Sequence, residues 1–198
     1  MTPDNEKLTT SKIIQFPEFR IQLRNALPAD RLVIYEWLAK SNVTKSMLGE
    51  PDFPDNPVPS FEEFSNDFSD EFFNADSNSP GKCFIIMDTD YEVGTMCYDL
   101  LNTVKKHAVL DIWLRDEQLC GKGYGSAALR LLCMHLFKTK DIRNFYIAPS
   151  LRNVRAVRAY ERAGFTQLTM SRDEAMEKFG LDIFDYNDNV VMIMTIDS

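Results

Sequence analysis

The chain has 198 residues, 44% of them hydrophobic and 12% aromatic, which is enough to bury a substantial core within a single domain. Its 30 acidic residues outnumber its 22 basic ones and give a net charge of −8 at pH 7, which argues against nucleic acid as a partner. Residues 1–12 are polar, and no apolar run approaches the ~20 residues needed to cross a bilayer, so we expect a cytoplasmic protein without a membrane partner.

The first half of the chain predicts strands and two helices. A strand is expected at 19–24 and a helix at about 29–40. Ser60 and Glu63 match a capping box, and four phenylalanines at helical spacing then predict a second helix with an aromatic face: Phe61, Phe64, Phe68 and Phe72. Runs at 83–88 and 91–101, joined through Thr89 and Asp90, predict a hairpin, and 109–114 reads as the next strand.

The second half predicts a parallel unit followed by closing strands. A helix after residue 126 has the buried stripe Leu129, Leu132, Cys133 and Leu136. A strand at 142–148 and a helix that begins after Asn153 complete the unit. Strands at 165–170 and 190–196 flank a short helix at 171–180, which Ser171 and Glu174 cap.

The cysteines and histidines give no metal-ligand spacing. The four cysteines are Cys83, Cys97, Cys120 and Cys133, and the only histidines are His107 and His135. We therefore expect neither a structural disulfide nor a zinc site.

A glycine-rich loop is the first motif that carries chemistry. Gly121, Gly123 and Gly125 alternate between an apolar strand and an amphipathic helix, so backbone N–H groups and the positive helix end can face one anion. A nucleoside triphosphate loop would need Ser or Thr after Lys122. A dinucleotide loop would need glycine in place of Ser126 and an acid about 20 positions on, which the 142–148 strand lacks. A different phosphate-bearing cofactor is indicated.

A second motif spans residues 153–165. Asn153 can cap a helix that Gly164 ends, and Asn153, Ala156, Tyr160 and Ala163 then share one face. Small residues on that face let a ligand lie close, with the Tyr160 phenol beside it. The arginines of this segment either form its solvent face or supply a contact to the cofactor phosphates: Arg152, Arg155, Arg158 and Arg162.

These two motifs, in this order and spacing, resemble the GCN5-related N-acetyltransferase (GNAT) superfamily, best over residues 107–165. The resemblance implies an α/β (α+β) GNAT fold: a mixed central sheet of six to seven strands with four or five flanking helices. It would occupy residues 19–198 as one domain, after an N-terminal extension at 1–18. Whether the protein is a monomer or a homodimer is left open.

The resemblance also implies acetyl-coenzyme A (acetyl-CoA) as cofactor, with its pyrophosphate on residues 121–126 and its pantetheine arm between two splayed strands. The implied cofactor contacts are Ile112, Trp113, Leu114, Cys120, Gly121, Lys122, Gly123, Tyr124, Gly125, Ser126, Asn153 and Ala156. Cys120 stands where the superfamily has Arg or Gln, so backbone amides would carry more of the phosphate binding.

Asp111 is the strongest candidate for chemistry because it interrupts an apolar strand, on the same side as Trp113. An unpaired carboxylate inside a packed sheet is costly, so Asp111 faces solvent, has a partner or lines a cleft. Aminoglycoside 6′-N-acetyltransferases are similar here and at residues 158–165. The similarity implies direct acetyl transfer to a primary amine, with Asp111 as proton acceptor and Tyr160 as proton donor to the thiolate. The structural alternatives are that Asp111 is a solvated strand residue and that Tyr160 is a packed helix aromatic.

The acidic segment 50–81 contains nine acids and no Lys or Arg, which favours a polycationic substrate or is a solvated surface. Trp37, Tyr98 and Asp99 are candidate substrate contacts, although Trp37 also fits a core position. Three functions follow. The favoured one is acetylation of a cationic small molecule such as an aminoglycoside or polyamine. The others are acetylation of a protein amine and cofactor binding without turnover.

Overall fold

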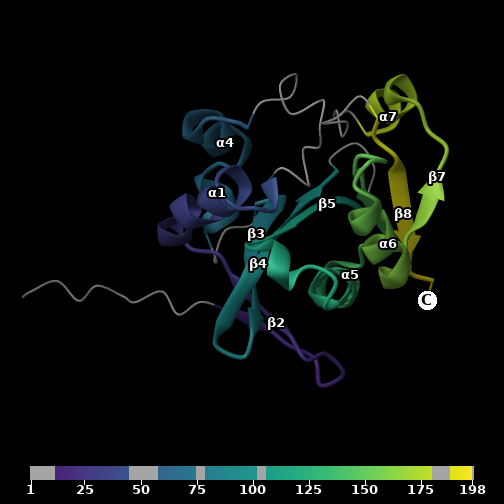
Figure 1. Ribbon diagram of the computed structural model, residues 1–198. Coiled ribbons are helices and arrows are strands. Elements are labelled where there is room, and N and C mark those ends of the chain that lie inside the picture. The colour runs from purple at the N-terminus through teal and green to yellow at the C-terminus, as the bar shows by residue number, and fades with distance from the viewer. Residues whose placement is uncertain (1–11, 45–57, 75–78, 102–105, 180–187, 198) are drawn as a thin grey trace, which may run out of the picture.

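A single mixed sheet organises the described part of the chain, which in this computed structural model comprises residues 12–44, 58–74, 79–101, 106–179 and 188–197 (Figure 1). Its strand order is β1-β2-β3-β4-β5-β6-β8-β7. The strands are β1 (Ile13–Ile14), β2 (Gln22–Asn25), β3 (Gly81–Asp88), β4 (Tyr91–Leu100), β5 (His107–Leu114), β6 (Asn144–Ile147), β7 (Thr166–Leu168) and β8 (Val191–Thr195).

The sheet of 8 strands has one more than the six to seven expected. The additional strand is β1, which pairs with β2 and lies within the segment expected as an extension. Every neighbouring pair is antiparallel except β5 and β6, so the parallel unit predicted around the glycine loop is confirmed.

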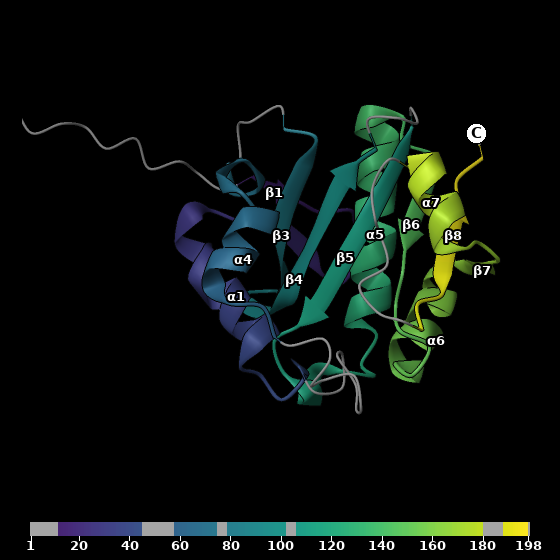
Figure 2. The ribbon, with the colours of Figure 1, turned by 90° about the horizontal axis from the view of Figure 1, so that it is seen from above.

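Helices cover both faces of the sheet. They are α1 (Arg31–Ala39), α4 (Phe61–Asp67), α5 (Tyr124–Lys140), α6 (Val154–Ala163) and α7 (Arg172–Phe179), with short 3₁₀ helices η1 (Pro28–Asp30), η2 (Asp70–Phe73) and η3 (Glu117–Leu119). α1 and α4 pack Ile34, Trp37 and Phe64 against one face. α5 and α6 bury Leu129, Leu132 and Val157 on the other face, and Figure 2 shows α5 behind the sheet when α1 and α4 are in front.

The predicted capping boxes are present, but the aromatic helix is shorter than expected. Ser60 N donates to Glu63 Oε2 at 2.7 Å, and Ser171 N donates to Glu174 Oε2 at 2.7 Å. The phenylalanine repeat does not run through one helix, because α4 ends at Asp67 with Phe68 as its C-cap, and Phe72 lies in η2. Ser69 takes an extended backbone as N-cap of η2, as short polar residues that favour helix caps over helix interiors do.

The β3–β4 hairpin contains a disulfide, so the expectation that the chain has none is wrong. Cys83 and Cys97 are direct cross-strand partners, with a Cα–Cα distance of 4.1 Å, and their sulfurs are bonded. Asp88 pairs with Tyr91, and an uninterrupted ladder from this turn would place Cys83 opposite Met96. The register shifts by one residue between Ile86 and Met87, and this bulge brings Cys97 opposite Cys83.

Reduction of this disulfide is expected to destabilise the protein without unfolding it at room temperature. The bond closes a loop with a sequence separation of 14, for which chain entropy predicts about 3 kcal/mol and a fall in Tm of roughly 6–12 °C. Alkylation in denaturant, followed by mass spectrometry, should label two cysteines without a reductant and four with dithiothreitol. Labelling of all four without a reductant would contradict the bond.

β5 and β6 pair only at their starts. The paired residues are His107 with Asn144, Ala108 with Phe145 and Val109 with Tyr146. Beyond Val109, β5 continues to Leu114 along β4, whereas β6 pairs with β8. Figure 2 shows the two strands together at one end and apart at the other.

Candidate functional site

A cavity of about 250 Å³ lies where β5 and β6 diverge, beside the first turns of α5 and α6. Both predicted catalytic residues and all predicted cofactor residues except Lys122 line it: Asp111, Tyr160, Ile112, Trp113, Leu114, Cys120, Gly121, Gly123, Tyr124, Gly125, Ser126, Asn153 and Ala156. Lys122 is exposed beside the cavity. The two sequence motifs, about 30 residues apart, therefore form one site.

The glycine loop has the backbone that a phosphate cradle needs. Gly121 and Gly123 have φ angles of 76° and 90°, a region that side chains rarely tolerate. A Cβ atom at either position would meet no protein atom within 4 Å, so the space beside them is open. Gly123 caps α5 without a side chain, which leaves the first N–H groups of the helix for an anion. The backbone of this loop could therefore hold a phosphate group.

Ser126 and Asn153 use their side chains to hold the walls of the cavity together. Ser126 Oγ donates to the carbonyl of Ala159 at 2.7 Å and so ties α5 to α6. Asn153 Oδ1 accepts from the N–H of Ala156 at 3.1 Å and caps α6 as expected. Because these two side chains already bond to other groups of the protein, their segments would contact a ligand mainly through backbone groups.

Two arginines give the cavity positive charge. Arg155 and Arg162 line it, whereas Arg152 pairs with Asp188 at 2.8 Å. Arg155 and Arg162 are seven positions apart, two helical turns, so they lie on one side of α6. Arg155 also pairs with Glu117 at 3.2 Å.

Cys120 occupies the start of the loop as a half-buried thiol. Its Sγ lies 3.9 Å from the carbonyl oxygen of Asp116, and burial raises the pKa of the Cys120 thiol. A neutral thiol offers little to a phosphate, so a phosphate bound here would be held by the backbone and by cavity arginines such as Arg155.

Asp111 is exposed on the face of β5 that α1 and α4 partly cover, and it lines the cavity. Its Oδ1 accepts from the N–H of Ile112 at 2.8 Å, which orients the carboxylate. Trp113 shares this face but is buried, and its indole N–H donates to the carbonyl of Ile34 at 3.3 Å. The aspartate is therefore accessible beside a fixed aromatic wall.

The backbone N–H groups of β5 point alternately toward β4 and toward the side where β6 diverges. Arg115 N donates to Val93 O at 3.1 Å, and this sets which residues of β5 bond to β4. Alternation turns the N–H of Trp113 toward β4 and those of Ile112 and Leu114 toward the diverging side. Because the carboxylate of Asp111 already takes the N–H of Ile112, Leu114 is the better donor to a ligand carbonyl.

The three predicted substrate residues do not line the cavity. Trp37 is buried with Trp113 in the core under α1. Tyr98 is buried on the opposite face against Phe84, and burial raises its pKa to about 12. Successive residues of a strand face opposite ways, so Tyr98 and Asp99 cannot both line one cleft.

Asp99 lies on the same sheet face as Asp111. Asp99 pairs with Val109, and Cys97 pairs with Asp111, so the two aspartates are diagonal neighbours on adjacent strands. Burial raises the pKa of Asp99, against a smaller lowering by the N–H of Leu100. This face thus carries two carboxylates near the widening gap.

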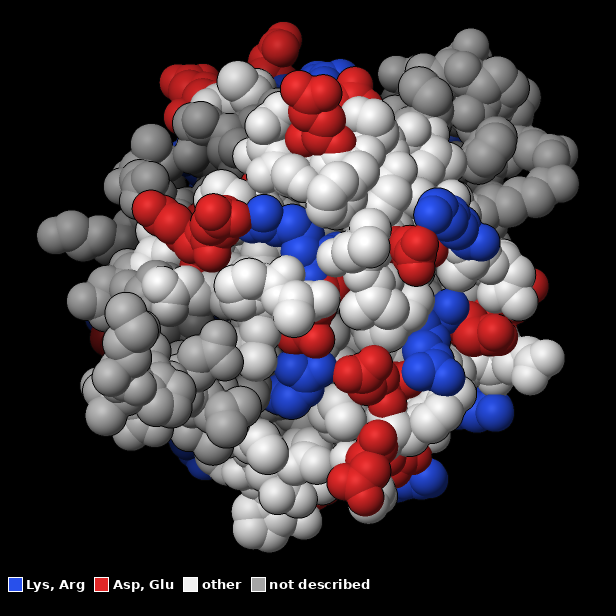
Figure 3. All heavy atoms as spheres, turned by 90° about the vertical axis from the view of Figure 1, so that its left-hand side faces the viewer, with Lys and Arg blue, Asp and Glu red and all other residues white. Residues whose placement is uncertain are grey.

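Only part of the acidic segment lies within the described residues. Residues 50–57 and 75–78 of this segment lie outside the described residues. On the side that Figure 3 shows, acidic side chains lie in small groups among basic and uncharged ones. Some have structural partners, such as Asp70 with Arg31 at 2.6 Å.

Neither a membrane span nor a metal cluster is found in the part of the chain that the structure describes. None of its helices is long and apolar enough to cross a bilayer. No group of three or more His, Cys, Asp or Glu side chains within those residues is placed to hold a metal ion.

A family model described as an acetyltransferase (GNAT) domain matches residues 20–166. An aminoglycoside N(6′)-acetyltransferase type 1 from Klebsiella pneumoniae is 25% identical over 168 residues, which is 80% of each chain.

Two solved structures share the fold. RimL, a ribosomal L7/L12 alpha-N-protein acetyltransferase in complex with coenzyme A, superposes with a TM-score of 0.67 at 23% identity over 94% of this chain and 99% of that one. A spermidine N-acetyltransferase from Vibrio cholerae, in complex with CoA and spermine, gives a TM-score of 0.64 at 19% identity over 89% and 95%.

Proposed function

The chain belongs to the GNAT acetyltransferase family, and from that premise we propose that it transfers an acetyl group from acetyl-CoA to a primary amine of a cationic small molecule. The observation that carries the proposal is that Asp111 and Tyr160 line the same cavity as the glycine cradle. The cradle would hold the diphosphate on the backbone of residues 121–126, and the gap between β5 and β6 would take the pantetheine arm.

Asp111 would accept the proton that the amine must lose. An alkyl ammonium with a pKa of about 10.4 is neutral in only ~1 molecule in 10³ at pH 7. The carboxylate is exposed, so it can hold the cation and then take its proton, directly or through one water. The N–H of Ile112 keeps the carboxylate oriented for this role.

Two further groups would act on the acyl side. Acetyl-CoA, when bound, supplies an acetyl group activated as a thioester. The N–H of Leu114 faces the diverging side of β5, where it can donate to the acyl oxygen as charge develops there. Tyr160 belongs to the small-residue face of α6 and lines the cavity, and its hydroxyl would return a proton to the departing sulfur.

The acceptor class is proposed from charge and from the relatives. Asp99 and Asp111 lie on one face of the sheet and would favour a substrate with two or more cationic groups. Two relatives are named for aminoglycosides and spermidine. A protein N-terminus is the second candidate, because RimL has the same fold and is named for that acceptor.

An amine panel tests the acceptor. Release of CoA thiol should depend on added amine, and kanamycin-like amino sugars or spermidine should be better substrates than neutral-sequence peptides. Because carboxylates concentrate a polycation and 0.1 M salt screens charges beyond about 10 Å, added salt should raise the KM of the polycation. The matched control is a singly charged amine, whose KM should rise less.

The outcomes separate the three functions. Preference for peptides, without a salt effect, would favour the protein-acetylating alternative. A preparation that binds acetyl-CoA but releases no thiol with any amine would favour a binding module.

A further inference from the structure

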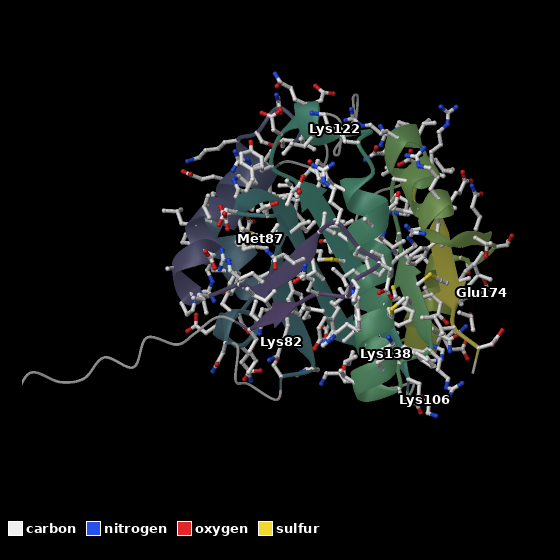
Figure 4. All side chains as sticks on the ribbon, turned by 90° about the horizontal axis from the view of Figure 1, so that it is seen from below. Lys82, Met87, Lys106, Lys122, Lys138 and Glu174 are labelled. Carbon is white, nitrogen blue, oxygen red and sulfur yellow. A yellow bond between two sulfur atoms is a disulfide. The ribbon has the colours of Figure 1, made fainter. Side chains whose placement is uncertain are left out.

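Tyr124 connects the cradle to the β3–β4 hairpin. It is the first residue of α5, and it lines the cavity. Its phenol donates to Asp88 Oδ2 at 2.6 Å, although Asp88 is 36 positions away at the end of β3. Figure 4 shows Met87, next to Asp88, nearer than Lys82 to the end of the molecule where Lys122 marks the glycine loop.

Asp88 is itself held firmly. Arg20 binds both carboxylate oxygens, through Nη2 at 2.6 Å and Nε at 3.2 Å, and its guanidinium carbon lies 6.0 Å from the centre of the Tyr124 ring. The Asp88 side chain is 12% exposed, whereas that of Arg20 is 78% exposed. The bond from Tyr124 is the main reason that the pKa of Asp88 is lowered, followed in the same direction by Arg20.

The start of α5 needs such support. Gly123 provides no side-chain cap, and a loop with three glycines loses much conformational freedom when it is fixed around an anion. A side-chain bond from the first helical residue to a strand end reduces that loss before the ligand arrives.

We propose that Asp88 is a positioning residue for the cofactor cradle: by binding the Tyr124 phenol it fixes the first turn of α5, and so prepares the cradle for the diphosphate of a coenzyme. The inference rests on the proposed use of the cradle. It assigns to the β3–β4 hairpin a role in cofactor affinity that differs from the role of β5 in chemistry.

Calorimetric titration of the full chain with coenzyme A tests this. Tyr124→Phe removes only the hydroxyl and should raise the Kd for coenzyme A about tenfold, as should Asp88→Ala. The double variant should bind no more weakly than the weaker single variant, because both changes break the same bond. Asp90→Ala, an exposed neighbour in the same turn, is the matched control and should bind like wild type.

Two further readouts separate positioning from general stability. The KM for acetyl-CoA should rise in Asp88→Ala, which does not line the cavity, while kcat and the KM for the amine stay near wild-type values. Amide hydrogen exchange should increase at residues 121–127. If Asp88→Ala does not fold, Asp88→Asn keeps the side-chain shape and should show the same effects in weaker form.

Several results would overturn the inference. Tighter binding by Asp88→Ala would mean that its charge merely repels the phosphates. An undiminished loss from Tyr124→Phe in the Asp88→Ala background would mean that the phenol acts on the ligand directly. Wild-type affinity in both single variants would remove the inference and leave the proposed function standing. No binding of coenzyme A by the wild type would overturn both.

Discussion

Gly123→Val is expected to weaken acetyl-CoA binding about tenfold or more. Gly123 has a φ of 90°, where a β-branched side chain costs roughly 1–3 kcal/mol, so valine would pull the loop out of its cradle conformation. Its methyl groups would also occupy the open space beside the loop, where the diphosphate would lie. Calorimetry with acetyl-CoA on folded protein measures the effect.

Gly164→Ala is the matched control for backbone strain. Gly164 has a φ of 108° and ends α6, but it is not among the residues that line the cavity. This variant should lose stability while keeping most of its affinity. Unchanged affinity of Gly123→Val for acetyl-CoA would show that the glycine loop does not bind the cofactor.

Asp111→Asn is expected to lower kcat by ~10² or more, with little effect on acetyl-CoA affinity. Asparagine has nearly the same shape, and its Oδ1 can still accept from the N–H of Ile112, so the change removes mainly the capacity to take a proton. Rates at saturating concentrations of both substrates measure this. Tyr160→Phe should also lower kcat.

Asp99→Asn separates chemistry from binding on the same face. Asp99 shares the sheet face of Asp111, so loss of its charge should raise the KM of a polycationic amine. Because Asp99 does not line the cavity, kcat should stay nearly unchanged. A wild-type rate in Asp111→Asn would show that this residue is structural, and the β5 carboxylate would lose its proposed role.

Local sequence determined much of the site because its signals act over a few residues. The alternating glycines forced the turn before α5, and Asn153 and Gly164 marked both ends of α6. The carboxylate within an apolar strand indicated that Asp111 is accessible. Each signal depends on backbone conformation or on the period of a helix or strand, so neighbouring residues suffice to express it.

Tertiary structure decided the features that depend on register and on distant partners. A one-residue bulge brought Cys83 and Cys97 together. No local sequence pattern predicted where the pairing register of the two strands shifts. The pairing of β4 with β5 likewise places Tyr98 in the core and Asp99 diagonally next to Asp111. The bond between Tyr124 and Asp88 exists only because α5 begins beside the end of β3, since the packing of helix on sheet sets which distant side chains can meet.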